Sequence, residues 1–510
     1  MKSNLKVARS ALDLKSFLQA TIEKADFKLS RVKLSQQQEW NLVHGVLGHK
    51  SGGFFYITGL VDDISGEEQL VLYQPQGAFN GLVLCKQEQD IYILLQARVE
   101  PGNSGIGQYG PTIQSTPANY LRFHGGKETP YFDFFFKYNP QVRPIANSMQ
   151  LDLGKRYFQK SKILSYVESD SLVDTAENMI WVPLKAVTEV LHYDNFLNTD
   201  LRSMLGVFDW DLFLDRNPST DIDTTHTNHL GFDHNLIGKN MGKLVPISQL
   251  QNWELTESGI VDRANTGISA NIYKVVSTTR EVKTWVQPLL CTANRGLITL
   301  LVRQAEDKSL DGHHSNFPSD KPNGQGGGPD RRLRNERSIV SQGETGDALQ
   351  RLPPQSHAAH GDGAKHRSRT TSDASASRAS LRFPQLEFLI SYQSEFGISG
   401  EKVLLPSQII YPGENVHNQT TLYKDGKVLC EVVQSEEGGR FYQNENIYQI
   451  ILIDSNVESR DEQFWISADA LKGLLKSSNK VSIQLRCIAS LVLKDINPCT
   501  FAEQLVAINI

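Results

Sequence analysis

Short apolar runs rich in β-forming residues recur along the chain and are bounded by polar residues, a pattern that predicts strands. Two of these runs, Gly81–Lys86 and Ile91–Ala97, are separated by only Gln87–Asp90, the length of a hairpin connection. Two similar runs, Gly296–Arg303 and Leu386–Tyr392, flank a long polar segment. We therefore predict two hairpins, the second of which carries a long insert in place of its turn.

The insert, residues 305–380, is rich in Gly, Ser, Asp, Arg, Pro and His, and Phe317 is its single aromatic residue. This composition predicts disorder. Five of the 13 histidines lie in it at irregular spacing, which favours a solvated linker over a metal site. They are His313, His314, His357, His360 and His366.

Several blocks of the first part of the chain recur in the second part in the same order. Gly81-Leu82 is echoed by Gly296-Leu297, Glu100-Pro-Gly102 by Glu395-Phe-Gly397, and Pro111-Thr112 by Pro406-Ser407. Trp181 and Trp465 each head a segment with apolar residues three and four positions apart, which is the spacing of an amphipathic helix. We predict an α+β fold made of two homologous repeats, each a strand-rich body followed by a helix, around a pseudo-twofold axis.

The repeat divides the chain into four parts. We predict an N-terminal extension (1–30), a first repeat (31–215), a connector (216–255) and a second repeat (256–510) that contains the insert. The connector holds His226, His229 and His234, and a polar loop explains these better than a metal site does.

Composition excludes several classes of protein. A chain of 510 residues is too long for one small core, and its net charge of -5 gives no basic field for nucleic acid. No apolar run approaches the ~20 residues that span a bilayer, and the N-terminus lacks a signal-peptide pattern, so we expect a cytosolic protein without a membrane partner. The five cysteines have no CxxC spacing, which favours reduced, mostly buried thiols over disulfides or zinc ligands.

Familiar catalytic motifs are missing, since the sequence has no GxxxxGK[ST], GxSxG or HExxH. Two polar stretches stand out instead. Gln96–Asn103 and Gly110–Gly126 supply charged, amide and titratable side chains within a short span, and the alternative to a binding site is a hydrogen-bonded loop cluster. Ser435–Asn446 contains Gly438-Gly439, which permits close backbone approach, and Arg440, which is suited to a diphosphate or a carboxylate.

These stretches carry a resemblance to a known family. The strings QARVEPGN (96–103), PTIQSTPANYLRFHGG (111–126), WVQPLL (285–290) and SEEGGRFYQNEN (435–446) resemble the NDP-hexose 2,3-dehydratases of deoxysugar biosynthesis. The resemblance covers both repeats except the insert and the extreme N-terminus. It implies halves with a Nudix-like fold, a cytosolic homodimer, and a lyase that removes water across C2 and C3 of dTDP-4-keto-6-deoxyglucose without a cofactor or a metal.

The resemblance also suggests roles for residues. We expect His124 or Glu100 as the catalytic base, and Tyr120 as an acid or a donor to the enolate oxygen. The residues expected to bind substrate are Arg98, Gln114, Ser115, Thr116, Pro117, Ala118, Asn119, Arg122, Trp285, Glu437, Gly438, Gly439 and Arg440.

The sequence departs from the family pattern at several positions. Gly53 stands where the family carries arginine, and Leu72-Tyr73 stands where we place the counterpart of Trp285. In the second half, Ser391–Gln393 and Pro406–Ile409 replace the expected Gln-Ala-Arg and Pro-Thr-Val-Gln. We therefore predict one nucleotide-sugar site, centred on the first half. The alternative is a catalytically impaired protein of the same fold that binds a nucleotide sugar or a partner.

Overall fold

The structure is a computed structural model, and it describes residues 4–63, 65–88, 90–122, 128–215, 242–280, 282–305, 386–394, 402–411, 426–454, 457–460 and 462–501. Met1–Glu306 and Phe383–Ile510 form one compact unit, which contains all the helices and strands of the described residues. Residues 306–380 of the predicted insert, with its five histidines, lie outside the described residues, as do the three histidines of the connector.

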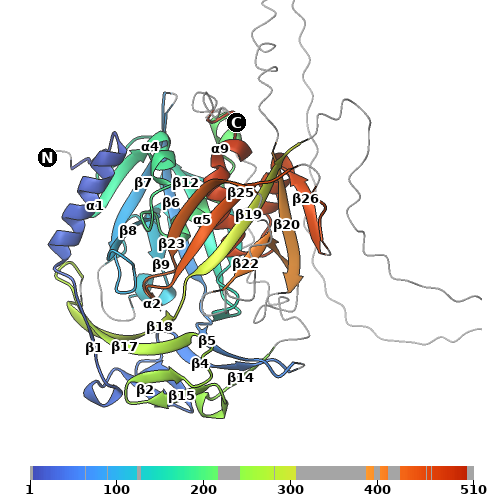
Figure 1. The fold of residues 1–510 in the computed structure, drawn as a ribbon. Coiled ribbons are helices and arrows are strands. Elements are labelled where there is room, and N and C mark those ends of the chain that lie inside the picture. The colour runs from blue at the N-terminus through green and yellow to red at the C-terminus, as the bar shows by residue number, and fades with distance from the viewer. Residues whose placement is uncertain are drawn as a thin grey trace, which may run out of the picture. The chain divides into compact units, whose positions relative to one another are not determined.

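The first seven-stranded sheet is built around the first predicted hairpin (Figure 1). β6 (Ala78–Gln87) pairs antiparallel with β7 (Asp90–Val99), and β12 (Ser161–Ser169) lies parallel to β6. The order is β10-β12-β6-β7-β13, with β9 on β6 and β8 on β7. The remaining bounds are β8 Gly107–Gly110, β9 Ile113–Ser115, β10 Val142–Leu151 and β13 Met179–Pro183. The first predicted hairpin is confirmed.

The second seven-stranded sheet has the same strand order. β19 (Gly296–Gln304) pairs antiparallel with β20 (Leu386–Ser394), and β25 (Glu445–Leu452) lies parallel to β19. The order is β23-β25-β19-β20, with β21 and β26 on β20 and β22 on β19. The remaining bounds are β21 Lys402–Pro406, β22 Gln408–Ile410, β23 Lys427–Ser435 and β26 Gln463–Ser467. Gln304 pairs with Leu386, so the long segment does replace the turn of the second predicted hairpin.

Each seven-stranded sheet contains a hydroxyl group that makes the same two hydrogen bonds. Thr112 Oγ1 accepts from Val83 N at 3.0 Å and donates to Leu94 O at 2.5 Å. Ser407 Oγ accepts from Leu301 N at 2.8 Å and donates to Leu389 O at 2.5 Å. In each sheet a buried hydroxyl therefore links the two strands of the central hairpin at the point where they separate.

Two six-stranded sheets also share one order, and they exchange a strand. β14, which lies within the predicted connector, pairs with β4 of the first half, whereas β1 near the N-terminus pairs with β17 of the second half. The sheet of the first half runs β11-β5-β4-β3-β2, with bounds β2 Trp40–Val43, β3 Val46–His49, β4 Tyr56–Val61, β5 Glu68–Tyr73, β11 Tyr157–Phe158 and β14 Lys243–Val245. The other runs β24-β18-β17-β16-β15, with bounds β1 Lys28–Arg31, β15 Trp253–Thr256, β16 Gly259–Asp262, β17 Ile268–Val276, β18 Thr284–Thr292 and β24 Phe441–Tyr442.

The strand register corrects one correspondence. Leu72 pairs with Tyr157 of β11, and Leu290 pairs with Phe441 of β24. Leu72 therefore matches Leu290, and the expectation that Leu72-Tyr73 occupies the place of Trp285 is wrong. The sequence misled here because Gln74-Pro75 and Gln287-Pro288 form a matching pair that aligns Leu72 with Trp285, whereas the strand pairing does not.

Helices cover the sheets and fill the centre of the unit. α4 (Leu184–Val190) and α7 (Ala468–Leu475) directly follow the strands that contain Trp181 and Trp465, as predicted. α1 packs against β7 and β8, as Figure 1 shows. The other bounds are α1 Ala11–Ala25, α2 Pro117–Tyr120, α3 Asp133–Phe136, α5 Thr199–Val207, α6 Trp210–Asp215, α8 Ile483–Ala489 and α9 Leu493–Ile496, with 3-10 turns at Leu34–Gln36, Ile247–Gln249 and Ser490–Val492.

α5 and α8 pack closely against each other. A Cβ added at Gly206 of α5 would lie 2.2 Å from Arg486 O of α8, so only glycine permits this approach. The buried Arg202 donates to Gln434 Oε1 of the second half at 2.8 Å, and the buried Arg486 donates to Ser203 Oγ of the first half at 2.8 Å. The two halves therefore share one interior. In the described part of the chain, no helix is long and apolar enough to cross a membrane.

Candidate active site

The end of β7 carries a buried ion pair. Arg98 Nη2 donates to Glu100 Oε1 at 2.7 Å, and Arg98 Nη1 donates to Gln96 Oε1 at 2.8 Å. The side chains of Arg98 and Glu100 are only 13% and 7% exposed, so the pair is shielded from bulk water. A carboxylate held in this way has a fixed orientation.

Gln114 on β9 belongs to the same cluster. Its Oε1 accepts from Asn198 Nδ2 at 2.8 Å, and Asn198 also caps the N-terminus of α5. A Cβ added at Gly110 would lie 2.6 Å from Arg98 Cδ, 2.9 Å from Asn198 Nδ2 and 3.3 Å from Gln114 Oε1. These three side chains therefore converge on Gly110. We call Gln96, Arg98, Glu100, Gln114 and Asn198 the Arg98 cluster.

The segment after Gln114 forms the short helix α2. Ser115 and Ala118 are buried, Thr116 is the N-cap residue, Pro117 and Asn119 lie within the helix, and the exposed Arg122 follows it with a φ of 56°. Tyr120 stacks on Phe132 with the ring centroids 5.0 Å apart, and burial raises the pKa of its phenol. Tyr120 therefore keeps its proton at neutral pH, as a donor must. His124 lies outside the described residues.

The segment Glu437–Arg440, which we call the EGGR turn, lies against the first half. Gly438 O accepts from Gly102 N at 2.8 Å, and a Cβ added at Gly438 would lie 1.9 Å from Asn103 Oδ1. Only glycine permits this approach, as the sequence suggested for Gly438. The turn therefore reaches the loop that follows Glu100.

Trp285 and Arg440 lie around the same turn. Trp285 Nε1 donates to Gln287 Oε1 at 2.7 Å, and Gln287 Nε2 donates to Gly439 O at 3.0 Å. The guanidinium of Arg440 lies 4.3 Å from the ring centroid of Phe55, and its Nη2 donates to Gln74 Oε1 at 3.3 Å. Trp285, Gly439 and Arg440 thus belong to one neighbourhood. In the part of the chain that the structure describes, no hydrogen bond or ring contact joins Tyr120 to Glu100 or to this turn.

Sequence reasoning missed a buried ionic group beside Glu437. Lys162 Nζ lies 2.8 Å from Asp200 Oδ1, 3.2 Å from Asp152 Oδ2 and 3.5 Å from Glu437 Oε2. Lys160 Nζ lies 3.2 Å from Asp152 Oδ2, and Tyr157 donates to Glu437 Oε2 at 3.0 Å. We call these six residues the lysine cluster. The available signal was Lys160-Ser-Lys162 at the start of an apolar strand, where a buried charge needs a partner.

The lysine cluster alters the ionisation of its members. Burial opposes the charge on Glu437, but Lys162, Lys160 and Arg440 outweigh it and lower the pKa of this carboxyl group. Burial lowers the pKa of Lys160, whereas the carboxylates around Lys162 outweigh burial and raise its pKa. Burial also raises the pKa of Asp200. Glu437 and Lys162 are therefore charged in the folded protein.

Asn80 is a second residue that sequence reasoning missed. It is fully buried on β6, opposite Gln114 in the register, and neither its amide nitrogen nor its amide oxygen has a hydrogen-bond partner in the protein. Such an amide is costly in a folded protein. The signal was a single polar residue within the apolar run Ala78–Cys85.

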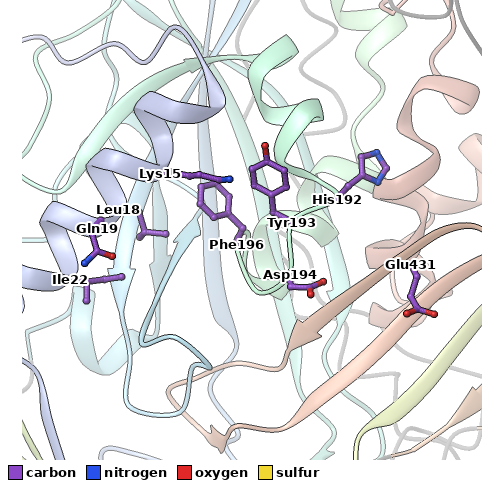
Figure 2. A pocket seen from close by; sticks show the side chains of 9 residues that line it. All are labelled: Lys15, Leu18, Gln19, Ile22, His192, Tyr193, Asp194, Phe196 and Glu431. Atoms are coloured by element: carbon purple, nitrogen blue, oxygen red, sulfur yellow. The ribbon is translucent and has the colours of Figure 1, made fainter.

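An open groove of about 670 Å³ lies between α1, the segment after α4 and β23 (Figure 2). Its lining combines Lys15, Leu18, Gln19, Ile22, His192, Tyr193, Asp194, Phe196 and Glu431. Lys15 Nζ lies 4.1 Å from the ring centroid of Tyr193. None of the residues predicted for the active site lines this groove.

The sequence profile of the NDP-hexose 2,3-dehydratase family matches residues 11–208, 239–310 and 414–492, which is more than half of the chain. The chain belongs to this family. The matched ranges contain all of the residues predicted for the site, so the resemblance is confirmed. The match begins within the predicted N-terminal extension, at the first residue of α1.

Three relatives of this dehydratase-family chain are each described as dTDP-4-dehydro-6-deoxy-alpha-D-glucopyranose 2,3-dehydratase. The protein from Amycolatopsis orientalis is 26% identical over 55% of this chain and 61% of its own length, and the one from Saccharopolyspora spinosa 25% over 54% and 62%. These two matches span less than two thirds of the relatives. The match to the Streptomyces violaceoruber protein, at 23% identity, spans 91% of this chain and 93% of that protein.

A solved structure, the Nudix hydrolase RenU from M. smegmatis, covers 26% of this chain and 83% of its own, with 12% identity and a TM-score of 0.17. A similarity at this level supports no conclusion about the fold. The mixed sheets and few helices of the described residues are those of an α+β protein, as predicted.

Proposed function

We propose that the protein removes water across C2 and C3 of dTDP-4-keto-6-deoxyglucose by acid–base elimination without a cofactor. The observation that carries this proposal is the Arg98 cluster, in which an oriented carboxylate lies among hydrogen-bonding side chains in a member of the 2,3-dehydratase family. The names of the three relatives support the same substrate.

The chemistry follows from the substrate. Its 4-keto group acidifies the hydrogen on C3, so a base removes this proton and the electrons pass towards the carbonyl oxygen. The hydroxyl group on C2 then leaves as water once an acid supplies a proton, and the resulting enol tautomerises to a 3,4-diketo sugar. Acid–base steps of this kind each contribute about 10²- to 10⁴-fold in rate.

We assign the base to Glu100 or His124 and the acid, or the enolate donor, to Tyr120. Glu100 is supported by its buried, oriented carboxylate, and Tyr120 by the raised pKa that keeps its phenol protonated. Arg98, Gln114 and the α2 segment, with Arg122, would position the sugar. Trp285 would stack on the nucleobase of dTDP, and Arg440 with the EGGR turn would bind the diphosphate.

We also propose that the two halves are Nudix-like repeats related by a pseudo-twofold axis, and that the protein is a cytosolic homodimer. The two seven-stranded sheets share one strand order and the two six-stranded sheets share another, and this agreement supports the repeat, as do the matching hydrogen bonds of Thr112 and Ser407. Analytical ultracentrifugation tests the dimer, since a single species with the mass of one chain contradicts it.

The experiment that tests the function uses the purified protein, dTDP-4-keto-6-deoxyglucose and a 3-ketoreductase with its nicotinamide reductant, which reduces and so traps the unstable product. We expect mass spectrometry to detect a dTDP-linked 2-deoxy sugar that is absent without the protein. Thermal stabilisation by dTDP without any product would instead support the nucleotide-sugar-binding alternative, because a ligand stabilises the state it binds whether or not it reacts.

A further inference from the structure

The lysine cluster joins the two halves. Asp152, Lys160 and Lys162 come from the segment between β10 and β12 and from the start of β12, and Asp200 comes from α5. Glu437 is the only member from the second half, and it lies within reach of both lysines and the Tyr157 hydroxyl. The first half thus binds the side chain of Glu437.

Three positions of the lysine cluster have amide counterparts in the second half. Lys162 is the second residue of β12, and the second residue of the corresponding β25 is Asn446, whose amide donates to Glu436 Oε1 at 2.5 Å. Asn444 and Gln484 occupy the positions in the second half that correspond to Lys160 and Asp200 in the first. At these three positions the second half therefore buries neutral amides where the first half buries ionisable side chains, and the fourth position holds a carboxyl group in both halves, Asp152 and Glu436.

Buried charges are expensive to desolvate, and a neutral arrangement of similar size often gives equal or greater stability. Lys160 and Lys162 are only 1% and 4% exposed at the side chain. A charged cluster in the half that carries the Arg98 cluster, set against amides in the other half, is therefore better explained by a role in function than by stability.

The EGGR turn connects this cluster to the proposed site. Gly438 O is hydrogen-bonded to Gly102, close to Glu100, and Gly439 O is hydrogen-bonded to the Gln287 side chain that also binds Trp285. Arg440 follows directly. A shift of Glu437 would therefore displace contacts to the residues proposed for chemistry and to those proposed for nucleotide binding.

We propose that Lys162, with Lys160, Tyr157 and their carboxylates, positions the EGGR turn, so that the second half completes a nucleotide-sugar site in the first half. These are positioning residues, because they act through Glu437 and need not touch the substrate. The inference rests on the proposed function, since it takes the EGGR turn as part of the dTDP-sugar site.

The test compares two paired variants. Lys162→Met/Asp200→Asn removes one positive and one negative charge, and Lys472→Met/Asp211→Asn is the matched control, a half-buried lysine–aspartate pair at 3.1 Å that lies outside the site. We expect both to fold, with melting temperatures within ~5 °C of the wild type. We expect calorimetry to show that dTDP affinity falls about tenfold or more in the first variant only. We expect the KM of that variant to rise by a similar factor, and by more than its kcat changes.

Two milder variants keep the test informative if the paired variant does not fold. Lys162→Arg retains the charge and should recover most of the affinity. Tyr157→Phe removes only the hydroxyl donated to Glu437, and the corresponding residue of β24 is already a phenylalanine, Phe441. We expect Tyr157→Phe to weaken dTDP binding by about threefold to tenfold.

The outcomes separate the two proposals. A folded Lys162→Met/Asp200→Asn or Tyr157→Phe protein that binds dTDP as tightly as the wild type overturns the positioning role. A wild-type protein that binds dTDP but forms no product overturns the dehydratase activity and leaves the binding comparison intact. If the wild-type protein neither binds dTDP nor forms product, both the positioning role and the dehydratase activity are overturned.

Discussion

β6 and β9 of the first half correspond to β19 and β22 of the second, yet the two pairs carry different side chains at matching positions. Asn80 pairs with Gln114 in the first half, and Ile298 pairs with Ile409 in the second. Ile298 belongs to the hydrophobic core, whereas Asn80 is buried with an unpartnered amide. The fold accommodates apolar residues at these positions. The first half therefore carries polar groups where apolar packing is possible.

At other matching positions the two halves carry the same kind of side chain. Thr112 and Ser407 make equivalent hydrogen bonds, and Arg202 and Arg486 are both buried between the halves. Positions that hold the scaffold therefore agree between the halves, whereas most positions in the Arg98 and lysine clusters differ; Glu100 is an exception, because its counterpart is Glu395. This contrast supports the proposal that the two halves share a scaffold and that the first half carries the chemistry.

The largest effect should come from Arg98. Arg98→Met leaves Glu100 buried without its cation, so we expect kcat/KM to fall at least ~100-fold in the trapped-product assay. The matched control is Gln393→Met, at the corresponding position of β20, which we expect to change kcat/KM by less than about threefold. Equal losses in the two variants would remove the distinction between the halves.

The second prediction concerns the pH dependence of Glu436, which occupies the position in the second half that corresponds to Asp152. Burial raises the pKa of the Glu436 carboxyl group to about 7 in the folded protein, whereas its ordinary value is about 4.5. The contribution of Glu436 to stability is therefore complete below pH 4.5 and is lost as the pH rises from 4.5 to 7. Glu436→Gln should therefore become progressively more stable than the wild type between pH 5 and 7, by at most roughly 1.4 kcal/mol per pH unit. Melting curves across this range check the trend, and a constant difference would contradict it.

Exchanging the matched buried residues Asn80 and Ile298 should change the stability of the protein in opposite directions. Asn80→Ile removes an unpartnered buried amide, so we expect unfolding free energy to rise by about 1–3 kcal/mol in urea titrations. The reverse change, Ile298→Asn, should destabilise the protein, because it creates the same unpartnered amide in the other core. A loss of stability in Asn80→Ile would show that the amide is satisfied in the folded protein.

The smallest effect is expected at the paired positions on β9 and β22. Gln114→Ile removes the acceptor for Asn198, and we expect kcat/KM to fall about tenfold. Ile409→Gln should leave turnover unchanged. A Gln114→Ile protein with the activity of the wild type would place Gln114 outside the site.

The hairpins, the insertion point, the helices after Trp181 and Trp465 and the convergence of Arg98 with Gln114 could be predicted from the sequence. These features depend on local patterns and on motifs that lie close together in the chain. Glycine spacing at Gly438 also predicted a close backbone approach, which the contact with Asn103 confirms.

Other features depend on tertiary pairing that no local pattern contains. The correspondence of Gly81 with Gly296 was wrong, because the strand register matches Gly81, opposite Ile113, with Thr299, opposite Gln408. The lysine cluster combines residues from β12, α5 and the EGGR turn, which lie far apart in the sequence. The exchange of β1 and β14 between halves was equally hidden, because short polar strands resemble linkers.

The most direct test of the central claim, that the first half carries the dehydration, compares Glu100→Gln with Glu395→Gln in the trapped-product assay. Glu395 occupies the corresponding motif of the second half. We predict that the wild type and Glu395→Gln form the dTDP-linked 2-deoxy sugar at similar rates, while Glu100→Gln forms it at least ~100-fold more slowly with its fold intact. Full activity in Glu100→Gln, or an equal loss in both variants, would contradict the claim.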